Sequence, residues 1–208
     1  MNHSSRIPML TRQQLSQSPL LCRSKAVGCL VGLAVGDALG DLGRNHEHRL
    51  RYGIATELTA TGKSTDDTEF ALLTARTILD NQGNVTREAV VQSWQRYILD
   101  LGGVFERGGK PQYGAVANLR QGILPPLSGI DNVQNNDDGA AMRIAPIGII
   151  CAGQSSRAAE LAQIEAEISH DRDGIWAAQA VAASVAVAMV NGSVEEIISA
   201  GIATLPAD

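Results

Sequence analysis

The chain has 208 residues, a formal net charge of -5 and no cluster of basic residues, so it lacks the electrostatic footprint of a nucleic-acid-binding protein. Hydrophobic residues make up 44% of the sequence but aromatic residues only 3%, which means that the core must be built from Ala, Val, Leu and Ile. Such small side chains favour closely packed helices, and the length suits one domain with a substantial core.

The three cysteines, Cys22, Cys29 and Cys151, are an odd number and show no CxxC spacing. Neither a structural zinc site nor a disulfide framework is therefore indicated, and we expect a reducing, cytoplasmic location. The apolar stretch 26–39 contains Asp37, begins late for a signal peptide and is too short to span a bilayer. The sequence predicts no membrane partner.

Residues 1–20 are polar and show no convincing period, so we expect a flexible extension ahead of one domain over residues 21–208. The domain opens with a predicted helix over residues 26–39. Its glycines follow one another at four-residue steps along one stripe: Gly28, Gly32, Gly36 and Gly40. Each glycine lowers helix stability by about 1 kcal/mol relative to alanine, so a tight neighbour or a ligand must compensate. The spacing favours a packing groove for a second helix, and a bound ligand is the alternative.

Adjacent carboxylates, Asp66 and Asp67, lie between Thr65 and Thr68 and directly precede the apolar segment 70–79. Asp66 with Glu69 matches a variant capping box, which explains one carboxylate. The second is explained poorly by capping, because a helix needs one side-chain acceptor at its start. Oxygen ligands in this pattern also suit Mg²⁺ or Mn²⁺, so both interpretations stay open on these residues alone.

Helical periods predict further helices over residues 86–101, 155–168 and 175–190, the last nearly all apolar and therefore central. Thr86 is expected to cap the first of these, and a capping box from Ser193 to Glu196 opens a helix over 193–203. Residues 52–59 are the best strand candidate, whereas 102–111 and 124–139 have loop composition. We expect one all-α domain.

Five other polar residues are ambiguous by themselves. Asp37 lies on an apolar helix, so it is either hydrogen-bonded to a helix end or directed into a site. Arg143 could hold a loop or bind a phosphate, and His170 could interact with the dipole of a preceding helix or serve a site. Asp137 and Asp138 suit a turn.

Together the polar clusters resemble the ADP-ribosylglycohydrolase family. The matching segments keep the family's order from Lys25 onward, and they are GDALG at 36–40, TDDT at 65–68, DDGAAMR at 137–143 and Ser-His at 169–170 before an alanine-rich helix. The resemblance implies a compact orthogonal all-α domain. It also implies two Mg²⁺ or Mn²⁺ ions beside ADP-ribose, and hydrolysis of the bond from the anomeric carbon to a protein side chain or small acceptor.

By this resemblance, Thr65, Asp66 and Asp67 would bind metal, with Asp66 and Asp67 acting in catalysis. The nucleotide would be contacted by residues of the later loop and the Ser-His segment, namely Gly139, Met142, Arg143 and His170. The expected partner is an ADP-ribosylated protein or an ADP-ribose-containing small molecule.

The sequence departs from the family pattern at three places. Arg44 stands where many members have a glutamate, and Asp137-Asp138-Gly139 replaces the usual GNG. The family's second metal-ligand cluster, near its C-terminus, has no counterpart, so we expect a domain that is C-terminally incomplete relative to the family. The alternative function is therefore a non-catalytic binding or structural module, and exposed apolar surface would favour self-association.

Overall fold

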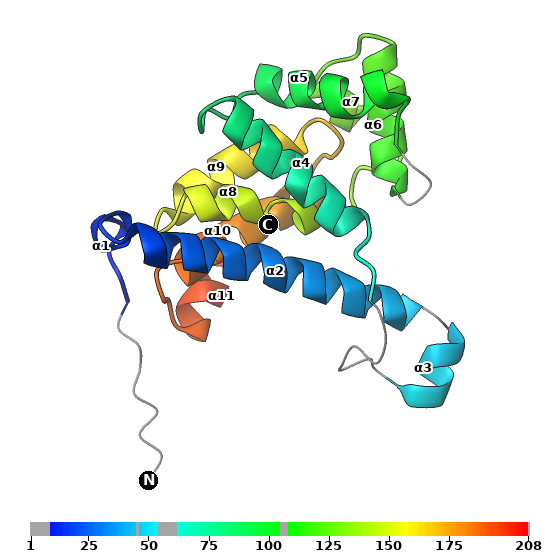
Figure 1. The fold of residues 1–208 in the computed structure, drawn as a ribbon. Coiled ribbons are helices and arrows are strands. Elements are labelled where there is room, and N and C mark those ends of the chain that lie inside the picture. Colours follow the sequence, from blue (N-terminus) through cyan, green and yellow to red (C-terminus); the bar gives the residue numbers. More distant parts are fainter. Residues whose placement is uncertain (1–8, 45, 54–61, 105–107, 208) are drawn as a thin grey trace.

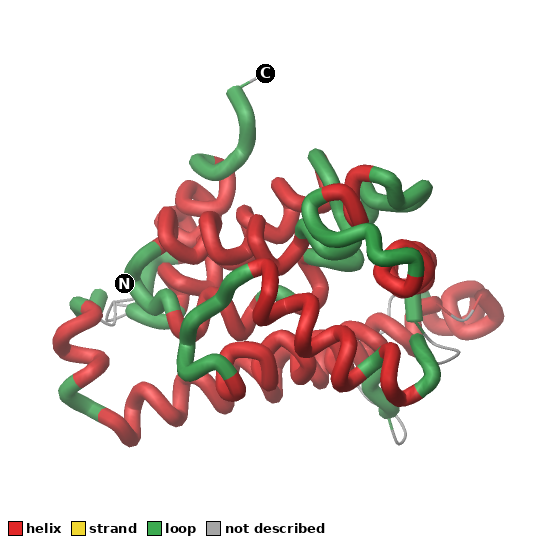
Figure 2. The backbone as a smooth tube through the Cα atoms, turned by 90° about the horizontal axis from the view of Figure 1, so that it is seen from above, coloured by secondary structure: helices red, strands yellow, loops and turns green. Residues whose placement is uncertain are grey.

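A computed structural model describes residues 9–44, 46–53, 62–104 and 108–207 (Figure 1). Within these ranges every regular element is helical, which confirms the all-α prediction, and the backbone view of Figure 2 shows only helices and loops. The elements in chain order are α1 (Arg12–Ser16), α2 (Pro19–Arg44), α3 (His46–Tyr52), α4 (Asp66–Asp80), α5 (Arg87–Tyr97), η1 (Leu99–Leu101), α6 (Lys110–Arg120), α7 (Leu127–Ile130), η2 (Ala141–Arg143), α8 (Ala145–Ile150), α9 (Ser155–Ala166), α10 (Asp173–Ala188) and α11 (Val194–Ile202).

Helix α10 is the centre of the fold and packs against α8, α9 and α11. Its alanines Ala178, Ala182 and Ala186 are completely buried, which lets neighbouring helices approach closely. The closest approach is at Gly148 of α8, where an added Cβ would lie 2.5 Å from Cβ of Val185. The prediction of a central, mostly buried helix over 175–190 is confirmed.

Two helix caps also formed as predicted. Thr86 accepts a hydrogen bond from the amide of Ala89 at the start of α5, and Ser193 with Glu196 forms a complete capping box at α11. The loop prediction for 124–139 missed the short helix α7, and the α6 helix was not predicted. Of the strand candidate 52–59, Tyr52 ends α3 and residues 54–59 lie outside the described residues.

An ordered helix lies within the segment predicted as an extension. Thr11 caps α1, and the side chain of Leu15 is 2% exposed because it packs with Ala152, Met189 and Val190. The described part of residues 1–20 is thus attached to the helical body.

Helix α2 is the longest element and runs across the front of the molecule in Figure 1. It packs against α4 and α8 with one side. On the other side, a Cβ added at Gly28, Gly32, Gly36 or Gly40 would meet no atom within 4 Å. Among the described residues, the glycine stripe therefore has no tight neighbour.

Candidate active site

The start of α4 is capped by a carboxylate from another helix. Asp37 of α2 accepts hydrogen bonds from the amides of Thr65, at 2.6 Å, and Thr68, at 3.2 Å. The hydroxyls of the same two threonines also donate to Asp37, at 2.5 and 2.6 Å. Of the two interpretations for Asp37, the structure shows the bond to a helix end.

This geometry corrects the predicted capping box of Asp66 with Glu69. The N-cap residue is Thr65, its side chain makes no cap hydrogen bond, and Asp66 is already the first residue of α4. The physical reason is that Asp37, from another helix, accepts from the amides of the N-cap residue Thr65 and of Thr68 in the first turn of α4. Neither Asp66 nor Asp67 is needed as a cap, so capping no longer accounts for this pair.

Negative charge accumulates at this helix start. Burial raises the pKa of Asp67 and the nearby carboxylates Asp37 and Asp66 raise it further, whereas a hydrogen bond from Thr65 and the positive charge of Arg44 oppose them. For Asp37, burial alone would raise the pKa, but its hydrogen bonds from Thr65 and Thr68 outweigh burial and lower it. Asp37 therefore stays ionised, and Asp67 is the residue on which the repulsion falls.

The oxygen ligands at the start of α4 fit part of a divalent-cation site. Thr65, Asp66 and Asp67 offer oxygen atoms, which hard divalent ions prefer, and a cation would relieve the repulsion that raises the pKa of Asp67. However, no group of three or more His, Cys, Asp or Glu side chains among the described residues could hold a metal ion. These residues thus supply some ligands and not a closed coordination shell.

The predicted nucleotide loop is built around a buried arginine. The Arg143 guanidinium is 0% exposed and binds Glu165 through Nε, at 2.9 and 3.1 Å. Its Nη1 donates to the carbonyl of Gly139 and its Nη2 to Ser169 Oγ, both at 2.9 Å. Arg143 also lies over the Trp94 ring, 5.4 Å from the centroid. The structure therefore uses Arg143 to hold the loop, and the predicted nucleotide contact stays a prediction.

His170 continues this network towards the surface. Its Nδ1 lies 2.8 Å from Ser169 Oγ, and its Nε2 lies 2.9 Å from the carboxylate of Asp137. Because the Ser169 oxygen already accepts from Arg143, its hydroxyl is free to donate to Nδ1, and Nε2–H can then donate to Asp137.

The protonation state of His170 agrees with this direction of hydrogen bonding. Burial and the nearby Arg143 charge lower the pKa of His170 to about 4, although Asp137 acts against them. A neutral imidazole cannot act as the cation that would pair with the α9 dipole. Instead it orients Asp137, whose side chain is 45% exposed.

The other two predicted nucleotide residues are a buried glycine and a partly buried methionine. Gly139 is buried, and an added Cβ would lie 3.0 Å from Asp137 Oδ1 and 3.2 Å from His170 Cε1. Met142 packs against the main hydrophobic core. In the described geometry the exposed carboxylates of this loop are those of Asp137 and Asp138.

Glu165 links the two groups of residues and was missed from the sequence. Thr74 of α4 donates to Glu165 at 3.1 Å, so the helix that carries Asp66 and Asp67 is fastened to the partner of Arg143. Helical spacing could have revealed it, because Glu165 lies three and four residues from Ala162 and Leu161 on the buried side of α9. Gln112 was missed too, and its Nε2 donates to the Gly139 carbonyl at 3.3 Å.

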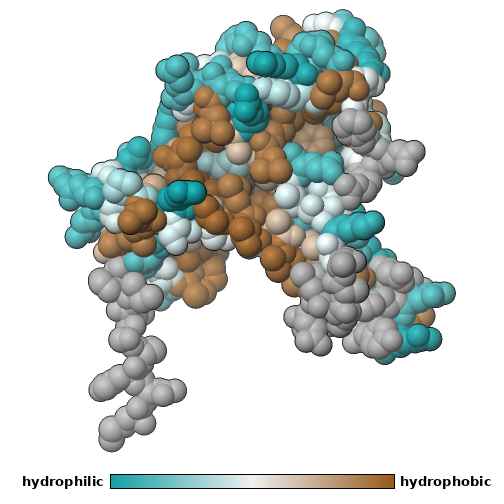
Figure 3. All heavy atoms as spheres, viewed as in Figure 1, coloured by the Kyte–Doolittle hydropathy of each residue, from teal (hydrophilic) through white to brown (hydrophobic). Residues whose placement is uncertain are grey.

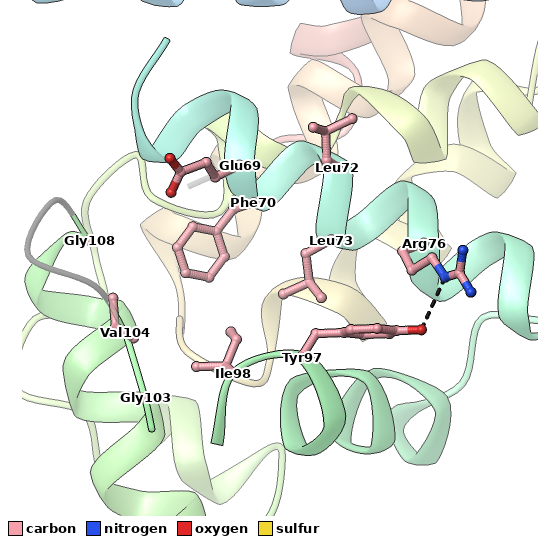
Figure 4. Close-up of a pocket in the computed structure, with 10 residues that line it drawn as sticks. All are labelled: Glu69, Phe70, Leu72, Leu73, Arg76, Tyr97, Ile98, Gly103, Val104 and Gly108. Carbon is pink, nitrogen blue, oxygen red and sulfur yellow. Dashed lines mark hydrogen bonds between the residues drawn. The ribbon is translucent and has the colours of Figure 1, made fainter. Parts of the chain in front are cut away.

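A cavity of about 280 Å³ lies one turn further along α4 (Figure 4). Its walls are mainly apolar, with Phe70 and Leu73 facing Ile98 and Val104, and Glu69 stands at one end. At the other end Arg76 donates to the Tyr97 hydroxyl at 3.0 Å. None of the predicted site residues lines this cavity, so it is a neighbour of the carboxylate cluster and separate from it.

Comparisons with known proteins identify relatives and a family for this chain. An uncharacterized protein of Archaeoglobus fulgidus is 32% identical over 181 residues, which cover 82% of this chain and 57% of the relative. The ADP-ribosylarginine hydrolase Tri1 of Pseudomonas putida is 27% identical over 199 residues, covering 90% of this chain and 53% of the relative. The chain thus spans about half the length of the curated relatives it matches. The ADP-ribosylglycohydrolase model matches residues 18–208, and the chain belongs to the ADP-ribosylglycohydrolase family.

Proposed function

We propose that the chain carries the metal-binding and loop-bearing part of a hydrolase that releases ADP-ribose from a modified protein side chain. The observation that carries this proposal is the carboxylate cluster at the start of α4, where Asp66 and Asp67 are not needed as caps and burial and neighbouring carboxylates raise the pKa of Asp67. Arginine is the first acceptor to test, because the Pseudomonas putida relative is named an ADP-ribosylarginine hydrolase.

In this proposal Thr65, Asp66 and Asp67 would hold Mg²⁺ or Mn²⁺. When bound, such an ion orients ribose hydroxyls, activates a water and stabilises the charge that develops as the glycosidic bond breaks. Asp37 prepares the ligands, because its four hydrogen bonds fix Thr65 and Thr68 before any cation arrives. The ligand Thr65 then needs no ordering during binding, which favours affinity.

The second group of residues would position the substrate. Arg143 holds the backbone of Gly139, and neutral His170 holds the exposed carboxylate of Asp137. A fixed carboxylate at the surface is an acceptor for hydroxyl donors such as those of ribose. Because Glu165 binds both Arg143 and Thr74, this loop keeps a constant position relative to α4.

The alternative function is a non-catalytic binding or structural module. One observation favours it: within the described ranges, no set of three or more acidic, His or Cys side chains could enclose a metal ion. Under this alternative the chain folds and behaves identically with Mg²⁺ and with EDTA.

The experiment measures ADP-ribose release from an ADP-ribosylated arginine substrate, with Mg²⁺ and with EDTA, alongside Mn²⁺ binding by electron paramagnetic resonance. We expect Asp66→Ala with Asp67→Ala to abolish Mn²⁺ binding. The matched control is Asp100→Ala, which removes an exposed carboxylate elsewhere and should leave binding unchanged.

The two readouts separate the hypotheses. Mg²⁺-dependent release together with Mn²⁺ binding supports the hydrolase. Mn²⁺ affinity that survives the double substitution contradicts the ligand assignment. A folded chain with neither activity nor Mn²⁺ binding supports the non-catalytic module, provided that a serine-linked substrate is also left intact.

A further inference from the structure

The surface of the molecule has an apolar part and a charged part. Hydrophobic residues are exposed along α2 at the front of the molecule in Figure 3, among them Val31 at 55%. The loop before η2 instead exposes the carboxylates of Asp137, at 45%, and Asp138. A ligand rich in hydroxyl groups would find hydrogen-bond acceptors at this loop and none on the valine side chains of α2.

The carboxylate of Asp137 is held from the interior by a chain of hydrogen bonds with one direction. Because arginine donates and never accepts, Arg143 Nη2 donates to Ser169 Oγ at 2.9 Å. The hydroxyl proton of Ser169 is then left for Nδ1 of His170, at 2.8 Å. With Nδ1 as an acceptor, the imidazole proton lies on Nε2, which donates to Asp137 Oδ1 at 2.9 Å.

Burial makes each link of this chain necessary. The side chains of Arg143 and Ser169 are 0% exposed and that of His170 is 1% exposed, so their polar atoms must find partners inside the protein. Ser169 has to accept on one side and donate on the other through a single oxygen atom. Alanine could do neither.

The direction of the chain determines which atom of Asp137 faces a ligand. Oδ1 accepts from His170 Nε2 and from the amide of Gly139, both at 2.9 Å. No hydrogen bond from a described residue reaches Oδ2, so Oδ2 is the atom that a ligand can use. If the imidazole proton lay on Nδ1, the bare Nε2 would face the carboxylate, and the two acceptors would repel each other.

We propose that Ser169 is a positioning residue, which keeps the proton of His170 on Nε2 and thereby directs Oδ2 of Asp137 towards a hydroxyl group of the substrate. This inference rests on the proposed function, in which Asp137 accepts from ribose hydroxyls. It adds a buried residue that acts on the substrate through two others.

Removal of the Ser169 hydroxyl should change the titration of His170. The charged groups that act on His170 are Arg143, which lowers its pKa, and Asp137, which raises it. In the native chain, a proton on Nδ1 would displace the hydrogen bond from Ser169. Without that hydroxyl, the neutral imidazole loses one hydrogen bond, and the pKa of His170 should rise from about 4 towards its ordinary value of 6.5.

Long-range ¹H–¹⁵N NMR spectra of the 208-residue chain test this positioning role. At pH 7 the unsubstituted chain should show a neutral His170 with its proton on Nε2. At pH 5.5, Ser169→Ala should raise the protonated fraction of His170 by about fivefold, which corresponds to one hydrogen bond of about 1 kcal/mol. Ser169→Thr keeps a hydroxyl and should restore the fraction of the unsubstituted chain.

The matched control is Ser128→Ala. Ser128 is also 0% exposed, and its hydroxyl donates to the carbonyl of Ile168 at 2.9 Å, so this substitution also removes a buried serine hydrogen bond. It should leave the His170 spectrum unchanged. A proton on Nδ1 in the unsubstituted chain, or a protonated fraction that Ser169→Ala does not change, overturns the positioning role.

Isothermal titration calorimetry with ADP-ribose at pH 7 tests the link to the substrate. Ser169→Ala should weaken binding by up to about tenfold, and Ser169→Thr and Ser128→Ala should not. Loss of affinity in a chain that hydrolyses no substrate would contradict the proposed hydrolase and support the inference. Hydrolysis with an ADP-ribose affinity that Ser169→Ala leaves unchanged would support the hydrolase and overturn the inference. A folded chain that binds no ADP-ribose would overturn both.

Discussion

At the residue scale, Asp37 of α2 caps the start of α4, whereas a helix is usually capped by a side chain next to it in the sequence. We expect Asp37→Ala to lower the free energy of unfolding by about 1–2 kcal/mol, because the amides of Thr65 and Thr68 lose their acceptor. The measurement is urea denaturation at pH 7. Asp41→Ala is the control on the same helix: its side chain is exposed, so its effect should stay within about 0.5 kcal/mol. Equal effects of the two substitutions would contradict the cap.

Buried, neutral His170 should make stability depend on pH. The folded-state pKa is about 4 and the ordinary value is 6.5, so between these values the unfolded chain binds a proton that the folded chain does not. Stability attributable to His170 is therefore complete above pH 6.5 and is lost as the pH falls towards 4, by on the order of 3 kcal/mol.

Comparison of the parent chain with His170→Gln isolates this contribution. Urea denaturation at pH 7 and at pH 4.5 should show a smaller loss of stability for the variant, since glutamine does not titrate. A variant that loses as much stability as the parent between these pH values would show that His170 is not buried and neutral.

At the scale of elements, two Arg–Glu pairs of similar length differ in burial. Arg143 and Glu165 are 2.9 Å apart with side chains 0% and 3% exposed, whereas Arg157 and Glu160 are 2.8 Å apart with side chains 56% and 63% exposed. Arg143→Ala leaves a buried carboxylate unpaired and should cost about 3–5 kcal/mol, while Arg157→Ala should cost about 0–1 kcal/mol.

The Arg143–Glu165 pair connects α4, α9 and the loop at Gly139, so its stability bears on the geometry of the site. Thermal and urea unfolding provide the measurement, and Arg143→Met combined with Glu165→Met is the check on mechanism. If the penalty arises from an unpaired charge, the double variant should recover much of the stability lost by Arg143→Ala. A double variant as unstable as the single one would instead assign the loss to packing, for example against Trp94.

At the scale of the whole molecule, the free face of α2 separates two kinds of glycine. Val185 of α10 fills the space that a Cβ at Gly148 would need, whereas a Cβ at Gly32 would meet no atom within 4 Å in the single chain. Glycine thus allows close helix packing inside the fold at one position and leaves open space on the surface at the other. Sequence spacing indicated the stripe, but only the positions of α4 and α8 revealed which side of α2 is left uncovered.

The features that could be predicted from the sequence are those that local interactions specify. The all-α class, the caps at Thr86 and Ser193 and the buried character of α10 depend on residues within a few positions of one another. The ordered motifs also indicated the family that the family model matches. These signals are readable because capping and helical periodicity act over three or four residues.

The partners and protonation states of the charged groups, in contrast, became known from the three-dimensional arrangement alone. Asp37 caps a helix that begins 29 residues later, and Glu165 pairs with Arg143 across 22 residues while also binding Thr74. His170 is neutral because burial and Arg143 disfavour its charge. Long-range partners and desolvation set these outcomes, and neither is encoded in the spacing of neighbouring residues.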